Sequence, residues 1–201
     1  MEDDYQIIAE TFQDIIHTIA LAVDELAIPI QAGVAALTAT LLREGKIIIC
    51  GNGVDASTAQ LLSSNLLGCF EQERPALPAL VLGCDSASTG AIATWQGFDD
   101  IFSRQVRALG QPGDLLVCIS SGSGASNITR AAQAAAERNM SVLALSNPAD
   151  TELADLIQAT GAVINCQAAR RPRVVELHTM VIHMLCELTD HSLFGTHNGS
   201  S

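Results

Sequence analysis

A segment rich in serine and glycine, residues 119–127 (ISSGSGASN), has the composition of an anion-binding loop. It follows an apolar run and precedes a helical pattern, so backbone N–H groups without helical partners would gather at its end. There, Ser120, Ser121, Ser123 and Gly124 could bind a phosphate or sugar phosphate. The same residue types also cap helices and form tight turns, so the sequence leaves both interpretations open.

A second loop of this kind, Gly51-Asn52-Gly53, lies between an apolar run and another helical pattern. Asp55 follows it, where a bound anion would sit. Two like unit charges about 4 Å apart repel by roughly 4 kcal/mol at an effective dielectric of 20, so Asp55 disfavours a phosphate there. Alternatively, Asp55 caps the following helix or lies in its first turn, where the helix dipole favours an acid. Both interpretations argue against a tightly bound phosphate.

Short apolar runs alternate with helical segments over most of the chain, and this pattern is typical of parallel strands buried on both faces. It predicts an α/β fold, a three-layer sandwich with a roughly five-stranded parallel sheet. In such sheets ligands bind beyond the carboxyl ends of the strands, so both loops should face one site. The expected strands are 46–50, 76–82, 114–120, 141–146 and 162–166.

Helical segments flank this core. Residues 1–45 are expected to form a helical pair, 4–22 and about 29–44, separated at Pro29 and available for oligomer packing. A long helix is expected over 173–194, and the polar tail 195–201 is expected to be disordered. We therefore predict a single domain over 1–194, with the α/β core at 46–194.

Composition excludes several classes of function. The formal net charge of −12 disfavours direct binding to nucleic acid, because such binding needs clustered Lys and Arg. No uninterrupted apolar run is long enough to span a membrane, and the acidic start MEDDYQ is unlike a secretory signal, so a cytoplasmic protein is expected. The six cysteines are widely spaced, which favours buried free thiols over a zinc site or a disulfide framework.

Several separate segments resemble the sugar isomerase (SIS) domain family, and within it the subgroup of phosphoheptose isomerases and DnaA initiator-associating (DiaA) proteins. The matching segments are GKIIICGNG, ERPALPAL, FDDIFSRQVRALGQPGDLLVCISS and RVVELHTMVIHMLCELTDHSLF. The resemblance implies a homotetramer built partly from the N-terminal helices and a sugar-phosphate site between the two loops. In the isomerases it also implies a metal held by His, Glu, Gln and His, with the Glu and the last His moving a proton.

This sequence departs from that pattern at most of the chemical positions. The positions of the four metal ligands hold Leu61, Asn65, Val175 and His183, so we expect no metal, no cofactor and no intact catalytic set. His183 alone keeps the family residue, although a lone histidine on an apolar helix more often has a structural role. The loops then form a vestigial phosphate pocket, whose expected members are Gly51, Asn52, Gly53, Ser120, Ser121, Ser123 and Gly124.

The end of the long helix carries an apolar pair, Leu193 and Phe194, that resembles the surface by which DiaA proteins bind the initiator DnaA. Such a pair either anchors the helix end or forms an exposed contact. With the acidic charge, it predicts a non-catalytic scaffold that binds DnaA and promotes its assembly at the chromosomal origin. The alternatives are a phosphoheptose isomerase acting on sedoheptulose 7-phosphate and a sugar-phosphate-binding sensor.

Overall fold

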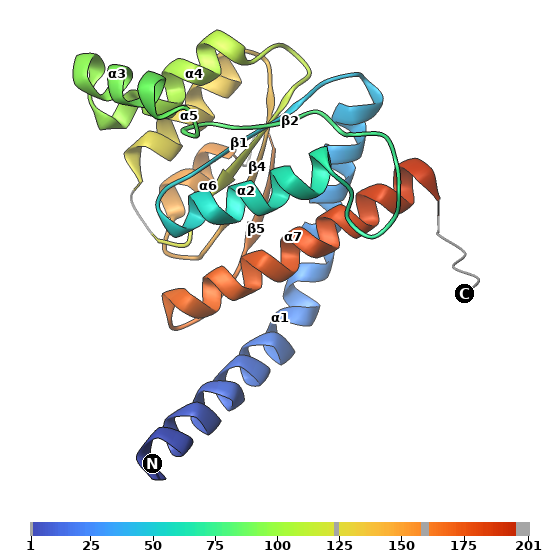
Figure 1. Ribbon diagram of the computed structural model, residues 1–201, viewed down its shortest axis with the longest axis vertical. Coiled ribbons are helices and arrows are strands. Elements are labelled where there is room, and N and C mark those ends of the chain that lie inside the picture. Colours follow the sequence, from blue (N-terminus) through green and yellow to red (C-terminus); the bar gives the residue numbers. More distant parts are fainter. Residues whose placement is uncertain (1, 123–124, 158–160, 196–201) are drawn as a thin grey trace.

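The structure, a computed structural model, describes residues 2–122, 125–157 and 161–195, in which helices and strands alternate (Figure 1). The strands are β1 (Ile47–Gly51), β2 (Ala79–Val81), β3 (Leu115–Ile119), β4 (Ser141–Ser146) and β5 (Gly161–Asn165). The helices are α1 (Glu2–Leu42), α2 (Val54–Leu67), α3 (Ser86–Gln96), the 3-10 turn η1 (Phe98–Asp100), α4 (Ile101–Leu109), α5 (Ser126–Glu137), α6 (Thr151–Ile157) and α7 (Arg171–Phe194).

The five strands form one parallel sheet in the order β2-β1-β3-β4-β5, which confirms the predicted fold class. In the register, Gly51 pairs with Ile119, and Ile119 pairs with Leu145. The central strands β1, β3 and β4 therefore end at the same level. As a result, the loops that follow them lie side by side at one edge of the sheet.

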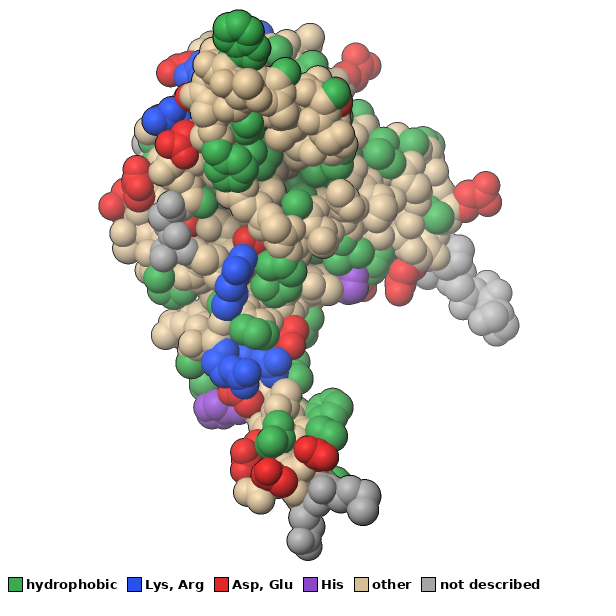
Figure 2. Space-filling model, turned by 60° about the vertical axis from the view of Figure 1, so that its left-hand side comes forward, with side chains coloured by type: hydrophobic (Ala, Val, Ile, Leu, Met, Phe, Trp, Pro, Cys, Tyr) green, Lys and Arg blue, Asp and Glu red, His purple; other side chains and the backbone are tan. Residues whose placement is uncertain are grey.

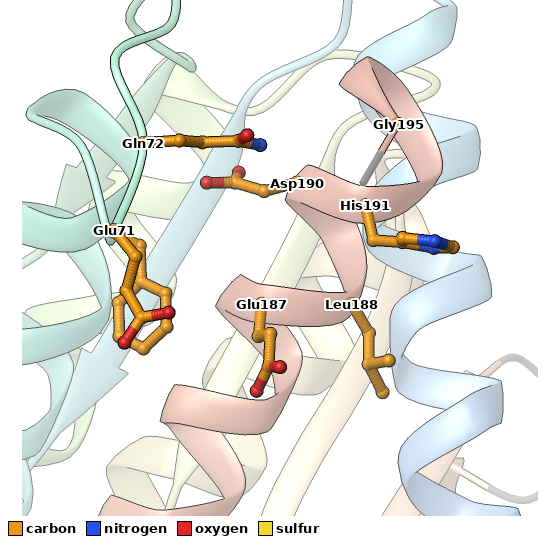
Figure 3. Close-up of a pocket in the computed structure, with 8 residues that line it drawn as sticks. Glu71, Gln72, Glu187, Leu188, Asp190, His191 and Gly195 are labelled. Carbon is orange, nitrogen blue, oxygen red and sulfur yellow. The ribbon is translucent and has the colours of Figure 1, made fainter. Parts of the chain in front are cut away.

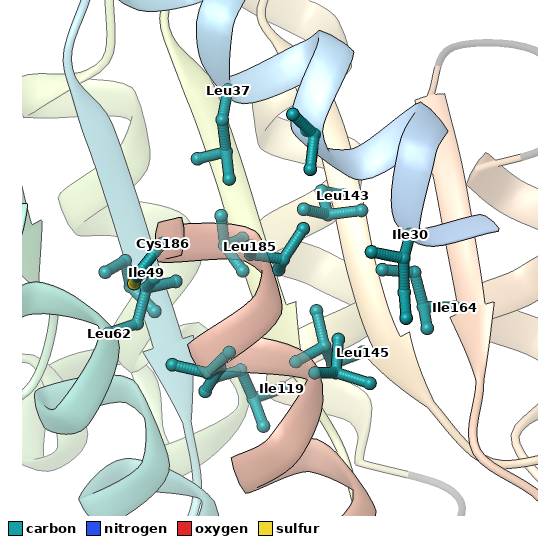
Figure 4. Packing of buried hydrophobic residues seen from close by; sticks show 14 of the residues in the cluster. Ile30, Leu37, Ile49, Leu62, Ile119, Leu143, Leu145, Ile164, Leu185 and Cys186 are labelled. Carbon is teal, nitrogen blue, oxygen red and sulfur yellow. The ribbon is translucent and has the colours of Figure 1, made fainter. Parts of the chain in front are cut away.

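Alternate residues of the central strands enter two separate cores, as the two-residue period of a strand requires. On one face, residues such as Ile49, Val117 and Leu143 pack with α1, α2 and α7 (Figure 4). On the other face, Ile48 and Leu116 pack with α4, α5 and α6. Both faces of the sheet are therefore covered by helices, and this is why the strand sequences are apolar throughout.

The N-terminal region is one continuous helix, α1, with Pro29 inside it, so the prediction of a helical pair was wrong. A proline inside a helix removes one backbone hydrogen bond and costs about 3 kcal/mol. The residues after it, Ile30, Val34 and Leu37, are buried against the core. Burying an aliphatic side chain of this size contributes about 1.5–3 kcal/mol, so this packing offsets the cost of the proline.

The first half of α1 extends away from the sheet (Figure 1) and carries exposed apolar side chains. By length and composition alone α1 could cross a membrane, with a mean hydropathy of 1.5 and 28% of the window buried. Core helices of soluble proteins pass the same test, and the second half of α1 packs on the sheet. The exposed apolar residues are Tyr5, Ile7, Ile8, Phe12, Ile16, Leu21, Val23 and Ile28.

The long C-terminal helix α7 begins two residues earlier than predicted, with Pro172 in its first turn, where the missing N–H has no helical partner to lose. It ends at Gly195, whose φ of 83° suits glycine. Residues 196–201 of the predicted tail lie outside the described part of the chain. All six cysteines are free as expected, but Cys69 and Cys84 are exposed rather than buried.

Candidate functional site

The loops after β1 and β3 meet at the carboxyl edge of the sheet, where a ligand site was predicted. The first loop depends on its glycines. A Cβ at Gly51 would lie 2.6 Å from the carbonyl oxygen of Asp55, and Gly53 has a φ of 58°. The two loops are joined by a reciprocal amide pair, in which Asn52 and Asn127 donate to each other at 2.8 and 3.0 Å.

The serines of the second loop are already engaged by other parts of the chain. Ser120 Oγ donates to Asp150 Oδ2 at 2.6 Å, and both residues are buried. Ser121 donates its backbone N–H to Asp55 Oδ2 at 3.1 Å. Helix α5 starts after Ala125 without a side-chain cap, so neither serine caps it. Ser123 and Gly124, the other predicted members of this loop, lie outside the described residues.

Asp55 lies in the first turn of α2, but it does not cap that helix. The N-cap residue is Gly53, and no side chain bonds to the first-turn amides. Instead the Asp55 carboxylate, from a residue only 4% exposed, receives the Ser121 N–H and faces the guanidinium of Arg171, with 3.6 Å between Nη2 and Oδ2. Arg171 Nε also donates to Ser121 Oγ at 3.0 Å. The expected cap is therefore replaced by a tie between α2, the β3–α5 loop and α7.

Basic side chains gather at the start of α7 (Figure 2), on a chain whose formal net charge is −12. This part of the sequence carries Arg170, Arg171 and Arg173. Arg170 and Arg171 are exposed, whereas Arg173 is buried and pairs with Glu176 at 2.7 Å. The exposed guanidinium groups are suited to an anionic ligand. Sequence reasoning missed them, and the only local signal was the RRPR segment.

Below this edge, His178 is fully buried, and its Nε2 donates to the carbonyl oxygen of Ser146 at 3.1 Å. Its Nδ1 has no hydrogen-bond partner among the described residues. Burial lowers the pKa of His178 from its ordinary value of 6.5, although the bond to Ser146 and the charge of Asp55 act in the opposite direction. The imidazole is therefore held neutral, as part of the support beneath the loops.

The positions that would hold the isomerase metal do not fit one. Leu61 packs against the core, and Val175 is likewise an aliphatic residue that cannot coordinate a metal. His183 is exposed and lies against Phe70, with ring centroids 5.6 Å apart. Across residues 2–122, 125–157 and 161–195, no group of three or more His, Cys, Asp or Glu side chains could hold a metal ion. We therefore derive no chemical step through a metal.

A cavity of about 450 Å³ lies elsewhere, between the segment after α2 and the end of α7 (Figure 3). Phe70, Glu71, Glu187 and His191 line it, and Asp190 there is paired with Arg74, so the two glutamates disfavour a phosphate. The predicted contact pair follows on the same helix. Leu193 is half-buried against the core and Phe194 is 44% exposed, so the first residue acts as an anchor and only the second is open. The carboxyl edge remains the better candidate for a sugar phosphate.

Comparisons of the sequence and of the structure with known proteins point to the same family. The sequence profile of the SIS domain matches residues 11–147. A phosphoheptose isomerase from Halorhodospira halophila is 42% identical over 197 residues, covering 98% of this chain and 100% of that protein. One from Laribacter hongkongensis is 40% identical over 181 residues, covering 88% of this chain and 92% of that protein. The solved phosphoheptose isomerase GmhA from Neisseria gonorrhoeae superposes with a TM-score of 0.87 at 33% identity, over 92% of this chain and 98% of that one.

These relatives overturn the predicted DnaA-binding scaffold. The similar proteins at 40–43% identity, and two solved structures with a TM-score of 0.87, are named phosphoheptose isomerases. The scaffold prediction rested on the missing metal ligands and on the C-terminal pair, of which Leu193 is half-buried against the core. The prediction of DnaA as a partner was therefore wrong, and the alternative of a phosphoheptose isomerase is the better one.

Proposed function

Because the chain belongs to the SIS domain family and aligns end to end with phosphoheptose isomerases, we propose that it isomerises a phosphorylated heptose, with sedoheptulose 7-phosphate as the substrate. The observation that carries this proposal is the 42% identity over 98% of the chain and 100% of the relative's length. The position of the loops at the carboxyl edge supports it, because that is where α/β sheets bind their ligands.

The charges around the site support an anionic substrate. Arg170 and Arg171 are exposed at the start of α7, and Arg171 contacts the loop that carries Ser121. A guanidinium group binds phosphate oxygens through two parallel hydrogen bonds, and so it can orient the substrate as well as attract it. These two arginines would hold the phosphorylated end of the sugar.

Isomerisation between a ketose and an aldose moves a proton between neighbouring carbons, so it needs a general base in contact with the sugar. We assign this role to His183 on residue type, because it is exposed on α7 and keeps the histidine of the isomerases. It lies against Phe70, about 18 Å along the helix from Arg171, so a sugar that contacts both must extend along α7. Replacing a general base usually lowers the rate by about 10²- to 10⁴-fold.

A second candidate function is binding of a sugar phosphate without turnover. A specific observation favours it: Leu61 and Val175 cannot ligate a metal, and the described part of the chain holds no three-residue metal group. Such a protein would keep the pocket and report the presence of the sugar. The two candidates share a ligand and differ only in whether it reacts.

We also propose a homo-oligomer, a tetramer, in the cytoplasm. The exposed apolar residues on the first half of α1, including Ile7, Phe12 and Ile16, support association between copies. Light scattering coupled to gel filtration would measure the assembly, and replacing Phe12 and Ile16 by serine should shift it towards smaller species. A monomeric wild type would contradict the assembly.

The deciding experiment combines a turnover assay with calorimetry on the purified protein and sedoheptulose 7-phosphate. We expect an aldose product in the proton NMR spectrum, unaffected by a chelator, and a loss of at least 10²-fold in His183→Gln. His191→Gln is the matched control, because His191 is exposed on the same helix but lines the acidic cavity. Binding without product would favour the second candidate. If the protein neither binds nor converts the sugar phosphate, both candidates are refuted. Turnover that a chelator abolishes would contradict the conclusion about the metal.

A further inference from the structure

A backbone N–H of the β3–α5 loop and a guanidinium group of α7 converge on one acidic side chain of the protein itself. Ser121 N–H lies 3.1 Å from Asp55 Oδ2, and Arg171 Nη2 lies 3.6 Å from the same oxygen. Backbone N–H groups and guanidinium groups are common partners of a bound phosphate. Here they surround a carboxylate, so an anion of the protein takes the position of an anionic ligand.

The location of Asp55 is not explained by the local needs of α2. The helix begins at Gly53 without a side-chain cap, and an aspartate in the first turn can satisfy the dipole while facing solvent. Asp55 is instead buried, and its Oδ1 has no hydrogen-bond partner among the described residues. An unpaired acceptor at a buried position is unfavourable. The contacts of Oδ2 with Ser121 and Arg171 must therefore outweigh that cost.

Arg171 is the exposed partner in this arrangement. Its side chain is 57% exposed, whereas that of Asp55 is 5% exposed. The carboxylate is therefore buried in the first turn of α2, while the guanidinium lies between it and solvent. An incoming phosphate can attract Arg171, but it meets a fixed negative charge at the Ser121 amide.

We propose that Asp55 is an internal anion that competes with phosphate for the Ser121 N–H and for Arg171. The phosphorylated end of a ligand binds weakly while Asp55 holds these groups. Removing the carboxylate opens the position. The inference rests on the proposed function only for the identity of the natural substrate, since inorganic phosphate tests the competition directly.

The test measures the dissociation constant of inorganic phosphate by calorimetry for the wild type, Asp55→Ser and Asp55→Asn. We expect at least tenfold tighter binding in Asp55→Ser. Asp55→Asn should gain less, because its amide oxygen still accepts the Ser121 N–H but carries no charge. Adding Arg171→Gln to Asp55→Ser should remove the gain, because the guanidinium is then missing. If Asp55→Ser does not fold, Asp55→Asn, which has nearly the same shape, carries the test with any tightening beyond threefold as support.

Asp150→Asn is the matched control, because Asp150 is a second buried acid at the same edge but bonds to the Ser120 hydroxyl. It should change phosphate affinity by less than threefold. An unchanged affinity in a folded Asp55→Ser, or an equal gain in Asp150→Asn, would overturn the inference. A gain in Asp55→Ser while the wild type neither binds nor converts sedoheptulose 7-phosphate would support the inference and refute the proposed function. Turnover in the wild type with no gain in phosphate affinity in Asp55→Ser would support the proposed function and refute the inference.

Discussion

Replacing Arg74 by methionine should destabilise the protein strongly, because this side chain joins α2 to α7 from a buried position. Its side chain is 1% exposed, and Nε donates to Asp190 Oδ1 at 2.7 Å. The other guanidinium nitrogens donate to the carbonyls of Leu66 at 2.9 Å and Asn65 at 2.7 Å. Those carbonyls belong to the last turn of α2 and need a donor. The substitution removes a counter-ion and a helix cap together.

The expected loss follows from the geometry. Unit charges 2.7 Å apart attract by about 6 kcal/mol at an effective dielectric of 20, but the lost hydration of both ions cancels much of this. Methionine at position 74 leaves Asp190 buried without its partner, and such a change costs about 3–5 kcal/mol in the free energy of unfolding. The double variant Arg74→Met/Asp190→Leu buries no charge, so it should be more stable than the single one.

Urea unfolding followed by circular dichroism measures these differences, at one protein concentration because association would otherwise shift the transition. The control is Arg107→Met, which breaks an exposed pair with Glu137 whose side chains are 49% and 59% exposed. That variant should lose less than about 1 kcal/mol. Our reasoning is refuted if Arg74→Met loses no more than Arg107→Met, or if the double variant is no more stable than Arg74→Met.

Two further predictions concern protonation. The lowered pKa of His178 means that the unfolded chain takes up a proton near pH 6.5 that the folded protein does not, so stability should fall as the pH drops from 7.5 to 5.5. The contribution of His178 to this loss in the free energy of unfolding is at most about 1.4 kcal/mol, measured by urea unfolding at the two pH values. The loss should be smaller in His178→Gln, and an equal loss in the wild type and the variant would contradict the prediction. A chromogenic disulfide that reacts with free thiols should, at pH 8, react quickly with the exposed Cys69 and Cys84 and slowly with the four buried cysteines. Burial raises the pKa of Cys166 and Cys186 to about 12, so absorbance showing more than two fast thiols would be inconsistent with the structure.

Most of the fold could be predicted from the sequence, because parallel strands buried on both faces leave continuous apolar runs. The segments 46–50, 114–120 and 141–146 all became strands within a residue of their predicted ends. The exceptions were β2, which begins three residues later than the predicted strand 76–82, and α1, where Pro29 favoured a break. The local helix propensity of proline predicts a break at this position. The helix continues because Ile30 and Leu37 pack against distant parts of the chain.

The candidate site was only partly predictable. The glycines of the first loop and the serines of the second predicted two loops at the carboxyl edge of the sheet, where the structure has them, because strand-to-helix turns have a recognisable composition. The partners of these residues carry no such signal. Arg171 lies 116 positions after Asp55 and 50 after Ser121, and no pattern in the sequence joins them. Asp55 lies in the first turn of α2, as one alternative predicted, but the other alternative, a side-chain cap, was wrong for this reason.

The sequence by itself determined the sheet, the place of the loops and the acidic balance of the chain, because each depends on residue type and short spacing. Only the tertiary structure decided which groups each polar side chain meets. The order β2-β1-β3-β4-β5 places the ends of β1, β3 and β4 next to one another and brings the start of α7 over them. The Asp55 carboxylate therefore has two possible partners, the first-turn amides of its own helix and a distant amide. In the structure it is buried beside Ser121 and Arg171 and accepts the Ser121 N–H.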